Sequence, residues 1–184
     1  MSAVLTTLDR LFGERQTTIA KDLKLNYRRM IEESTLSKQE SALLSVALAK
    51  SVDFTELLNA AKVEAIEAGV SEAGVQEAEE SAAIMGMLNI YYRYRHFVEH
   101  ADPAAKDEYG AAKLRMTSLG NPVLGKEMFE TLALAVSAIN GCEMCVSSHE
   151  KALMHLGVKR DKLHDVARIA AVVKGLSMLQ VSRD

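Results

Sequence analysis

Residues that interrupt helices are scarce in this chain, which has only two prolines and ten glycines among 184 amino acids. Both prolines, Pro103 and Pro122, lie in one stretch in the middle of the sequence, so the rest contains no residue that breaks a helix outright. β-Sandwiches and barrels need many turns, and turns rely on Gly and Pro. Strong helix formers such as Ala, Leu and Glu are abundant. The sequence therefore predicts an all-α fold.

The composition limits the class of protein further. Hydrophobic residues make up 48% and charged residues 26% of the chain, as in ordinary globular proteins, and the length favours a single domain over residues 1–184. A net charge of −3 gives no electrostatic basis for binding nucleic acid or an anionic membrane. The longest uncharged runs have 12 residues, whereas a membrane-spanning helix needs about 20. Because the N-terminus also lacks the basic region of a secretory signal, we expect a cytoplasmic protein.

Apolar periodicity and capping signals predict about eight helices. They cover residues 5–12, 14–33, 38–50, 53–68, 72–97, 126–139, 142–156 and 161–180. Ser37 and Glu40 have the spacing of a capping box at the start of the third helix. The second helix should bury Ile19, Leu23, Tyr27 and Met30. The helix at 72–97 is apolar almost all round, with Met85 and Met87 as expected core residues, which predicts central burial.

A weak internal repeat links the two halves of the chain. Residues 69–75, followed by Ala82-Ala83, align 88 positions later with residues 157–163, followed by Ala170-Ala171. This predicts an N-terminal scaffold repeat at about 37–99 and a C-terminal catalytic repeat at about 126–180, although Ala-rich helices can resemble one another by chance. Only the second copy carries cysteines. Glu77, Asn89, Tyr92 and His96 reproduce the spacing of Glu130, Cys142, Cys145 and His149 without thiols, which shows that spacing alone is weak evidence.

The segment that begins at Cys142 carries the most functional information. Asn140-Gly141 should end one helix, which places Cys142 at the start of the next, where free N–H groups and the helix dipole lower a thiol pKa. Cys142, Cys145 and His149 are spaced i, i+3 and i+7, so all three lie within about 60° on one helix face. A disulfide between the two sulfurs is therefore possible, with His149 beside them as a proton acceptor.

Other interpretations of a Cys-x-x-Cys pair remain open at this point. A structural zinc site needs four ligands, and Cys142, Cys145 and His149 supply three at most. Haem attachment needs a His directly after the second cysteine, where this chain has Val146. A thioredoxin-like protein needs strands, which the sequence does not predict. Two buried core cysteines would be the simplest explanation, but the His on the same face argues against it.

The wider motif resembles the alkyl hydroperoxide reductase D (AhpD) family within the carboxymuconolactone decarboxylase-like superfamily. The resemblance rests on Glu130, eleven intervening residues, and then Cys142-x-x-Cys145-x-x-x-His149. Residues 82–87 followed by Tyr91-Tyr92-Arg93 add to it, and it extends from about residue 21 to the C-terminus. One position departs from the pattern, because some members have a His immediately before the second cysteine and this chain has Met144.

The resemblance implies an antioxidant enzyme that reduces organic hydroperoxides. Cys145 would be the peroxidatic cysteine that becomes a sulfenic acid, and Cys142 the resolving thiol and proton donor. Glu130 would be the general base and His149 the proton relay. No bound cofactor or metal is implied. Electrons would come from dihydrolipoamide on a lipoyl-carrying acyltransferase, and they could pass to a partner peroxiredoxin. The protein would be a homotrimer.

Two further hypotheses belong to other classes. The dithiol could act only as a redox switch in a binding or adaptor protein, without turnover of peroxide. Alternatively, Cys142, Cys145 and His149 could hold a structural metal in a helical oligomer. Members of the superfamily that decarboxylate lactones lack the cysteines, so that activity is not expected here.

Overall fold

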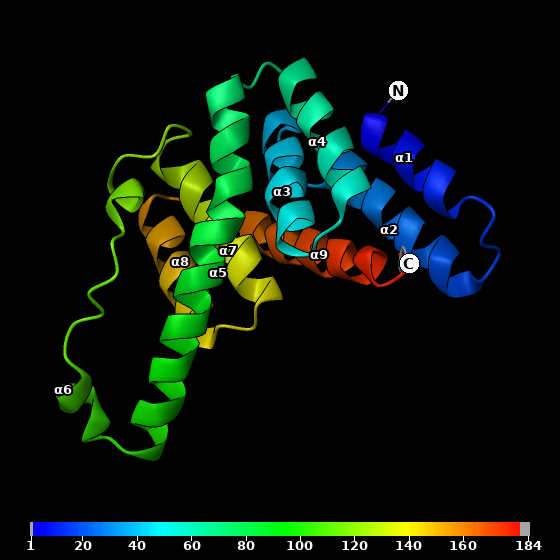
Figure 1. Cartoon of the computed structure of the whole chain (residues 1–184). Helices are drawn as coiled ribbons and strands as arrows, with labels where there is room; N and C mark the ends of the chain where they lie inside the picture. The colour runs from blue at the N-terminus through cyan, green and yellow to red at the C-terminus, as the bar shows by residue number, and fades with distance from the viewer. Residues whose placement is uncertain (1, 181–184) are drawn as a thin grey trace.

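The computed structural model describes residues 2–180, and this part of the chain contains only helices, without a β-strand. The all-α prediction is therefore confirmed (Figure 1). The described residues form nine α-helices and one 3-10 helix, rather than about eight helices. Their bounds are α1 Ala3–Phe12, α2 Thr18–Glu33, α3 Lys38–Ser51, α4 Thr55–Glu67, α5 Glu72–Ala101, α6 Ala105–Tyr109, η1 Thr117–Gly120, α7 Lys126–Ile139, α8 Glu143–His155 and α9 Arg160–Ser177.

Local capping chemistry sets most helix ends. The capping box at α3 is present, with the Ser37 hydroxyl accepting from the Glu40 backbone N–H and the Glu40 carboxylate accepting from the Ser37 N–H. α7 spans the predicted residues. α2 begins four residues later than predicted because the Thr17 side chain caps it through the N–H of Ala20. The irregular middle of the chain contains two short helices, α6 and η1, that the sequence pattern did not predict.

The core is built around α3 and α7. Every residue from Ser41 to Ala49 in α3 and from Phe129 to Ser137 in α7 is buried. α3 packs against α4, α5, α7 and α9, and α7 packs against α3, α5, α8 and α9. Each of these two helices therefore has neighbours on all sides.

Central burial of the helix at 72–97 was a wrong prediction. Only one face of α5 packs on the core, so Met85 is buried while Met87 and Ile90 are 38% and 63% exposed. A helix that is apolar all round can pack entirely in the chain's own core or leave one apolar face without a partner, and the sequence pattern is the same in both cases.

The buried face of α2 also differs from the prediction. Tyr27 and Met30 are buried and Leu23 is half-buried, but Ile19 is 68% exposed. Ile19 lies in the first turn of α2, where Ala20 is the residue that faces the core.

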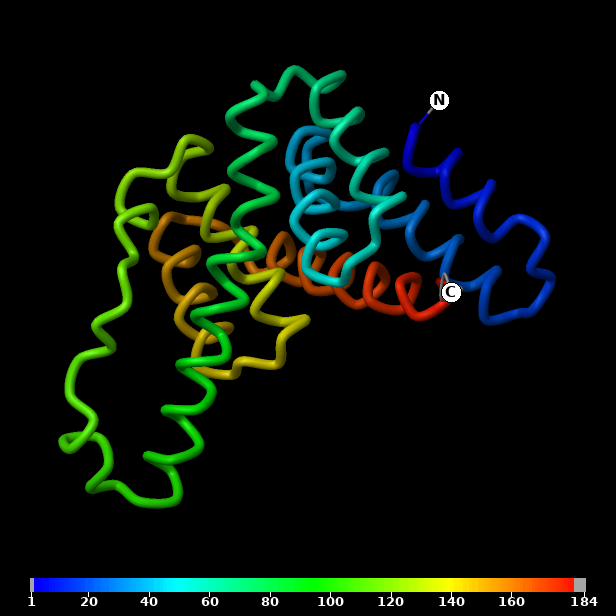
Figure 2. The backbone as a smooth tube through the Cα atoms, viewed as in Figure 1, coloured from blue at the N-terminus to red at the C-terminus, as the bar shows by residue number. Residues whose placement is uncertain are grey.

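The last part of α5 extends beyond the packed helices. Figures 1 and 2 show it continuing to α6, and the segment after α6 returning toward α7. The return segment is attached near its end by Glu77, whose carboxylate accepts hydrogen bonds from the backbone N–H groups of Val123 and Leu124 at 2.8 and 2.7 Å. The start of α7 is thereby fixed to α5.

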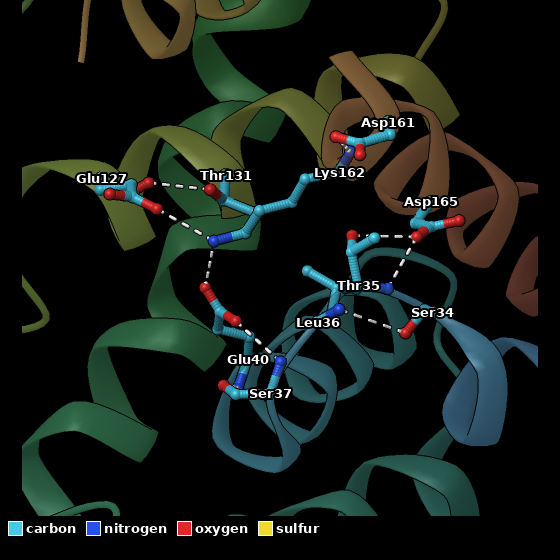
Figure 3. Close-up of polar contacts among 10 residues, drawn as sticks. All are labelled: Ser34, Thr35, Leu36, Ser37, Glu40, Glu127, Thr131, Asp161, Lys162 and Asp165. Carbon is cyan, nitrogen blue, oxygen red and sulfur yellow. Dashed lines mark hydrogen bonds and ion pairs between the residues drawn. The ribbon is translucent and has the colours of Figure 1, made fainter. Parts of the chain in front are cut away.

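A lysine on α9 joins three helices. The Lys162 ammonium contacts Glu40 of α3 at 2.5 Å and Glu127 of α7 at 2.9 Å (Figure 3). One turn further along α9, the Asp165 carboxylate accepts from the backbone N–H and the hydroxyl of Thr35, just before α3. These contacts hold α7 and α9 in place against the start of α3.

Within residues 2–180, no helix is both long enough and apolar enough to cross a membrane. The two-copy organisation at about 37–99 and 126–180 stays a prediction.

Candidate active site

The two cysteines lie where the chain reverses between α7 and α8. Gly141 has a φ of +66°, a left-handed conformation that glycine adopts without steric cost. The backbone N–H of Cys142 bonds back to the carbonyl of Ser137 at 3.2 Å, which closes the end of α7. α8 therefore begins at once, with Cys142 as its N-cap and its sulfur accepting from the backbone N–H of Cys145 at 3.4 Å.

Cys142 and Cys145 form a disulfide, and their Cα atoms are 5.3 Å apart. Placing both residues in the first turn of α8 thus brings the sulfurs together without any rearrangement of the backbone. Both residues are buried, with Cys142 fully inaccessible and Cys145 6% exposed. Cys145 is the more accessible residue of the pair.

Glu130 reaches the same site from α7. Glu130 lies ten residues before Asn140, toward the far end of α7 from the turn. It can contact α8 only if the two helices fold back on each other. They do: the Glu130 carboxylate lies 2.6 Å from Nδ1 of His149. His149 is one helical turn beyond Cys145 on α8, so the ring that contacts Glu130 is on the same helix face as Cys145.

A third charged group, which the sequence reasoning missed, completes this arrangement. The ammonium group of Lys126 lies 2.9 Å from the second oxygen of Glu130. Burial raises the pKa of the Glu130 carboxyl, but the hydrogen bonds from His149 and Lys126 outweigh burial and hold this pKa below its ordinary value. The i, i+4 spacing of Lys126 and Glu130 on one helix was the signal that could have identified the pair.

The ionised carboxylate determines which nitrogen of His149 carries the proton. Glu130 can only accept, so Nδ1 of a neutral His149 ring donates to it. Nε2 is then left with a free lone pair, which can accept a proton from a thiol. This arrangement can act as a proton relay for a thiol, because Glu130 on α7 contacts His149, which is on the same face of α8 as Cys145.

Met144, in place of the His found in some related proteins, is half-buried in the first turn of α8. Its neighbour Glu143 is exposed and lies 3.7 Å from Nε2 of His96, on α5. No group of three or more His, Cys, Asp or Glu side chains in residues 2–180 is arranged to hold a metal ion.

A known protein family matches the part of the chain that carries this site. The profile of the carboxymuconolactone decarboxylase family matches residues 108–182, which include α7, α8 and α9. The matched stretch also holds the disulfide at the start of α8 and the Glu130–His149 contact, so the site lies in the part of the chain that resembles the carboxymuconolactone decarboxylase family.

Relatives that match most of the chain show which family it belongs to. Alkyl hydroperoxide reductase AhpD of Anaeromyxobacter dehalogenans strain 2CP-1 is 42% identical over 154 residues, covering 84% of this chain and 80% of the relative. AhpD of Rhizorhabdus wittichii strain RW1 is 35% identical over 173 residues, covering 93% and 96%. The AhpD of Rhodopseudomonas palustris strain BisA53 is 40% identical over 166 residues, covering 90% of this chain and 88% of the relative. The chain belongs to the AhpD family of alkyl hydroperoxide reductases.

Proposed function

We propose that this protein is an antioxidant peroxidase that reduces organic hydroperoxides by cycling Cys142 and Cys145 between dithiol and disulfide. The relatives are named alkyl hydroperoxide reductases, which supports peroxide reduction. The observation that carries the proposal is the Glu130–His149 contact at 2.6 Å, beside a cysteine pair that is already joined as a disulfide. A thiol next to a positioned base is the arrangement that nucleophilic attack requires.

The oxidative step begins with ionisation of Cys145. Nε2 of His149 takes the thiol proton, directly or through a water molecule, and Glu130 stabilises the resulting imidazolium. The thiolate attacks the terminal peroxide oxygen of ROOH, the O–O bond breaks, and Cys145 becomes a sulfenic acid. The leaving alkoxide takes a proton from Cys142 and departs as the alcohol.

The second step closes the disulfide. The Cys142 thiolate attacks the sulfur of the Cys145 sulfenic acid, an S–S bond forms, and hydroxide leaves as water after protonation. The N-cap position suits Cys142 to this role, because the Cys145 backbone N–H is directed at its sulfur and stabilises the thiolate. Rapid closure also protects Cys145 from irreversible oxidation.

Dihydrolipoamide on a lipoyl-carrying acyltransferase is the proposed electron donor. One of its thiols attacks the sulfur of Cys145, the more accessible residue of the pair, and Cys142 leaves as a thiolate stabilised at the start of α8. The second lipoyl thiol then displaces Cys145, which yields lipoamide and restores the dithiol. The reduced protein could in turn reduce the disulfide of a partner peroxiredoxin. None of these steps requires a cofactor bound to the chain, and the cytoplasm supplies the reducing conditions.

We also propose that the protein assembles as a homotrimer through the outer face of α5. Met87, Ile90, Tyr94 and Phe97 follow the three- and four-residue spacing of helix pairing, and are 38–63% exposed. Apolar side chains gathered in this way on one helix face are typical of an interaction surface. A second copy of the chain is the proposed occupant because the spacing continues through Ala83 and Ala101, without a charged residue at any of these six positions.

Steady-state assays with an alkyl hydroperoxide test the enzymatic proposal, with dihydrolipoamide, glutathione and reduced thioredoxin compared as electron donors. We expect turnover with dihydrolipoamide, and loss of turnover in Cys145→Ser. In Cys142→Ser, one equivalent of peroxide should be consumed and Cys145 sulfenic acid should accumulate, detectable by dimedone labelling. Full activity of Cys145→Ser would overturn the assignment. Reversible disulfide formation without any turnover would instead favour the redox-switch protein.

A further inference from the structure

α5 contacts the turn between α7 and α8 through a fully buried asparagine. The Asn89 side chain donates from Nδ2 to the Ser137 hydroxyl at 2.8 Å, and its Oδ1 accepts from Nδ2 of Asn140 at 2.9 Å. Asn89 and Ser137 are both inaccessible to solvent. One side chain on α5 therefore joins the last turn of α7 to the residue that follows it.

One turn further along α5, Arg93 contacts the same segment. Its guanidinium group donates a hydrogen bond to the backbone carbonyl of Asn140. This carbonyl lies at the C-terminal end of α7, where the helix dipole favours a positive charge. Arg93 thus satisfies a carbonyl that α7 leaves free, and its charge lies against the residue two positions before Cys142.

The position of this turn determines the geometry of the site on both sides. Glu130 lies on α7 before the turn and His149 on α8 after it, so the turn sets how α8 lies against α7 and where His149 meets Glu130. Only Asn140 and Gly141 separate the end of α7 from the Cys142 N-cap. A displacement of about 1 Å in this turn would therefore reach the Glu130–His149 contact and the sulfurs together, and displacements of that size can cost about a hundredfold in rate.

Because Asn89 is buried, its hydrogen bonds restrict the position of the α7–α8 turn. A buried amide that loses its partners costs about 1–3 kcal/mol, so Asn89 restricts the turn to positions in which Ser137 and Asn140 meet it. An apolar side chain at the same place would fill space without imposing a direction.

We propose that Asn89 and Arg93 are positioning residues for the dithiol, which hold the α7–α8 turn so that Cys142 caps α8 and Glu130 meets His149. The inference rests on the proposed thiol chemistry, but it concerns the reactivity of Cys145 and not the identity of the oxidant. The charged groups around the dithiol are Lys126 and Glu130 on α7, Glu143 and His149 on α8, and Arg93 and His96 on α5.

The test measures alkylation of Cys145 by iodoacetamide in the fully reduced protein, mapped by mass spectrometry across a range of pH. Asn89→Leu keeps the branched shape of the side chain at Cγ and removes both hydrogen bonds. We expect its pH midpoint for alkylation to rise by about one unit, which corresponds to about tenfold slower alkylation below the midpoint. Arg93→Met should shift the midpoint in the same direction, and Arg93→Lys should restore most of the wild-type profile.

Ser45→Ala is the matched control. It removes a buried hydrogen bond of 2.7 Å, to Tyr27, that lies between α2 and α3 and away from the dithiol. We expect it to lower stability and to leave the alkylation profile unchanged. Wild-type profiles in both Asn89→Leu and Arg93→Met would overturn the proposal, as would an equal shift in the Ser45→Ala control. If Asn89→Leu does not fold, the two Arg93 variants decide the result alone.

The alkylation assay contains no peroxide, so its outcome is independent of turnover. If the wild-type protein failed to reduce peroxides while Asn89→Leu still shifted the profile, the proposed function would fall and the positioning role would stand. The converse result would remove the positioning role alone.

Discussion

The side chain of Glu130 is only 8% exposed. Its carboxylate remains ionised because two groups donate hydrogen bonds to it. His149 contacts one oxygen and Lys126 the other. The two neighbours act differently. His149 links the carboxylate to the helix that carries the cysteines, whereas the half-exposed ammonium group of Lys126 keeps the carboxylate charged. At the scale of single residues, the proposed chemistry therefore depends on a chain of three side chains from two helices.

Glu130→Gln should lower kcat/KM for peroxide about a hundredfold or more, the usual contribution of a positioned acid–base group. An amide can still bond to His149, but it cannot stabilise an imidazolium. Steady-state assays at neutral pH measure the loss. Glu150→Gln, one residue after His149 on α8, removes a carboxylate that pairs with Arg160 instead. A comparable loss in Glu150→Gln would contradict the specific role of Glu130.

Lys126→Met should move the acid limb of the activity profile to higher pH. Lys126 helps hold the pKa of Glu130 below its ordinary value, so the carboxylate stays charged as the pH falls. Without the ammonium group, burial raises this pKa and the charged form is lost at a higher pH. The measurement is kcat/KM across the acid range, where Lys126→Arg should retain the wild-type limb. An unchanged limb in Lys126→Met would show that His149 alone sets the charge.

At the scale of helices, the start of α3 is a junction of charged contacts. Lys162 joins α9 to Glu40 on α3 and to Glu127 on α7, while Asp165 accepts two hydrogen bonds from Thr35 (Figure 3). Burial raises the pKa of both the Glu40 and Asp165 carboxyls, but their hydrogen bonds outweigh burial, and both pKa values are lower than usual. The helices are thus held partly by groups that acid can discharge.

Lys162→Met should lower the free energy of unfolding by about 2 kcal/mol, because it leaves Glu40 only 24% exposed and without its ammonium partner. Urea unfolding followed by circular dichroism measures this. Lys151→Met, at an exposed position of α8, is the control and should change stability little. Equal effects of the two substitutions would contradict a structural role for the Lys162 contacts.

The pH dependence of stability follows from the same groups. A carboxyl whose pKa is lowered by folding stabilises the folded protein above its ordinary pKa, 4.5 for Glu40 and 3.8 for Asp165, and this stabilisation is lost as the pH falls through the folded pKa. The free energy of unfolding should therefore fall as the pH is lowered from about 5. Urea titrations at successive pH values measure it, and a smaller acid loss is expected in Lys162→Met. A stability independent of pH in this range would refute the argument.

At the scale of the whole molecule, α5 has two faces with different partners. Its inner face packs on α3 and α7, and Asn89 reaches the turn before the dithiol. Its outer face presents Met87, Ile90, Tyr94 and Phe97. The last part of the helix extends beyond the packed helices in Figures 1 and 2, and there Tyr94 also contacts Tyr109 of α6.

The double substitution Ile90→Asp/Phe97→Asp should convert the proposed trimer into a monomer. Burying a large apolar side chain stabilises the assembly by about 1.5–3 kcal/mol. A charged side chain buried in the same place destabilises it instead. Sedimentation velocity of the wild type and variant measures the assembly. Val63→Asp, at a 49% exposed position on α4, is the control. A wild-type monomer, or an assembly that persists in the double variant, would contradict this interface.

The sequence alone predicted the helical class and most helix positions, because capping, periodicity and helix breakers act over a few residues. It could also identify Cys142, Cys145 and His149 as neighbours, since one helix brings them together. The sequence could not predict the contact between Glu130 and His149 by itself. The contact forms only because the chain reverses direction at Gly141. Lys126 escaped notice because its importance depends on where Glu130 is directed.

What tertiary structure alone decided is which side of each helix meets which neighbour. Local patterns could not tell that α3 and α7 would be the central helices, or that half of α5 would face outward, because apolar residues satisfy a core and an interface equally well. Nor could they bring Asn89 to the turn before Cys142, 53 positions away in the sequence. Such contacts arise from the packing of whole helices, in which each buried polar group must find a partner supplied by another part of the chain.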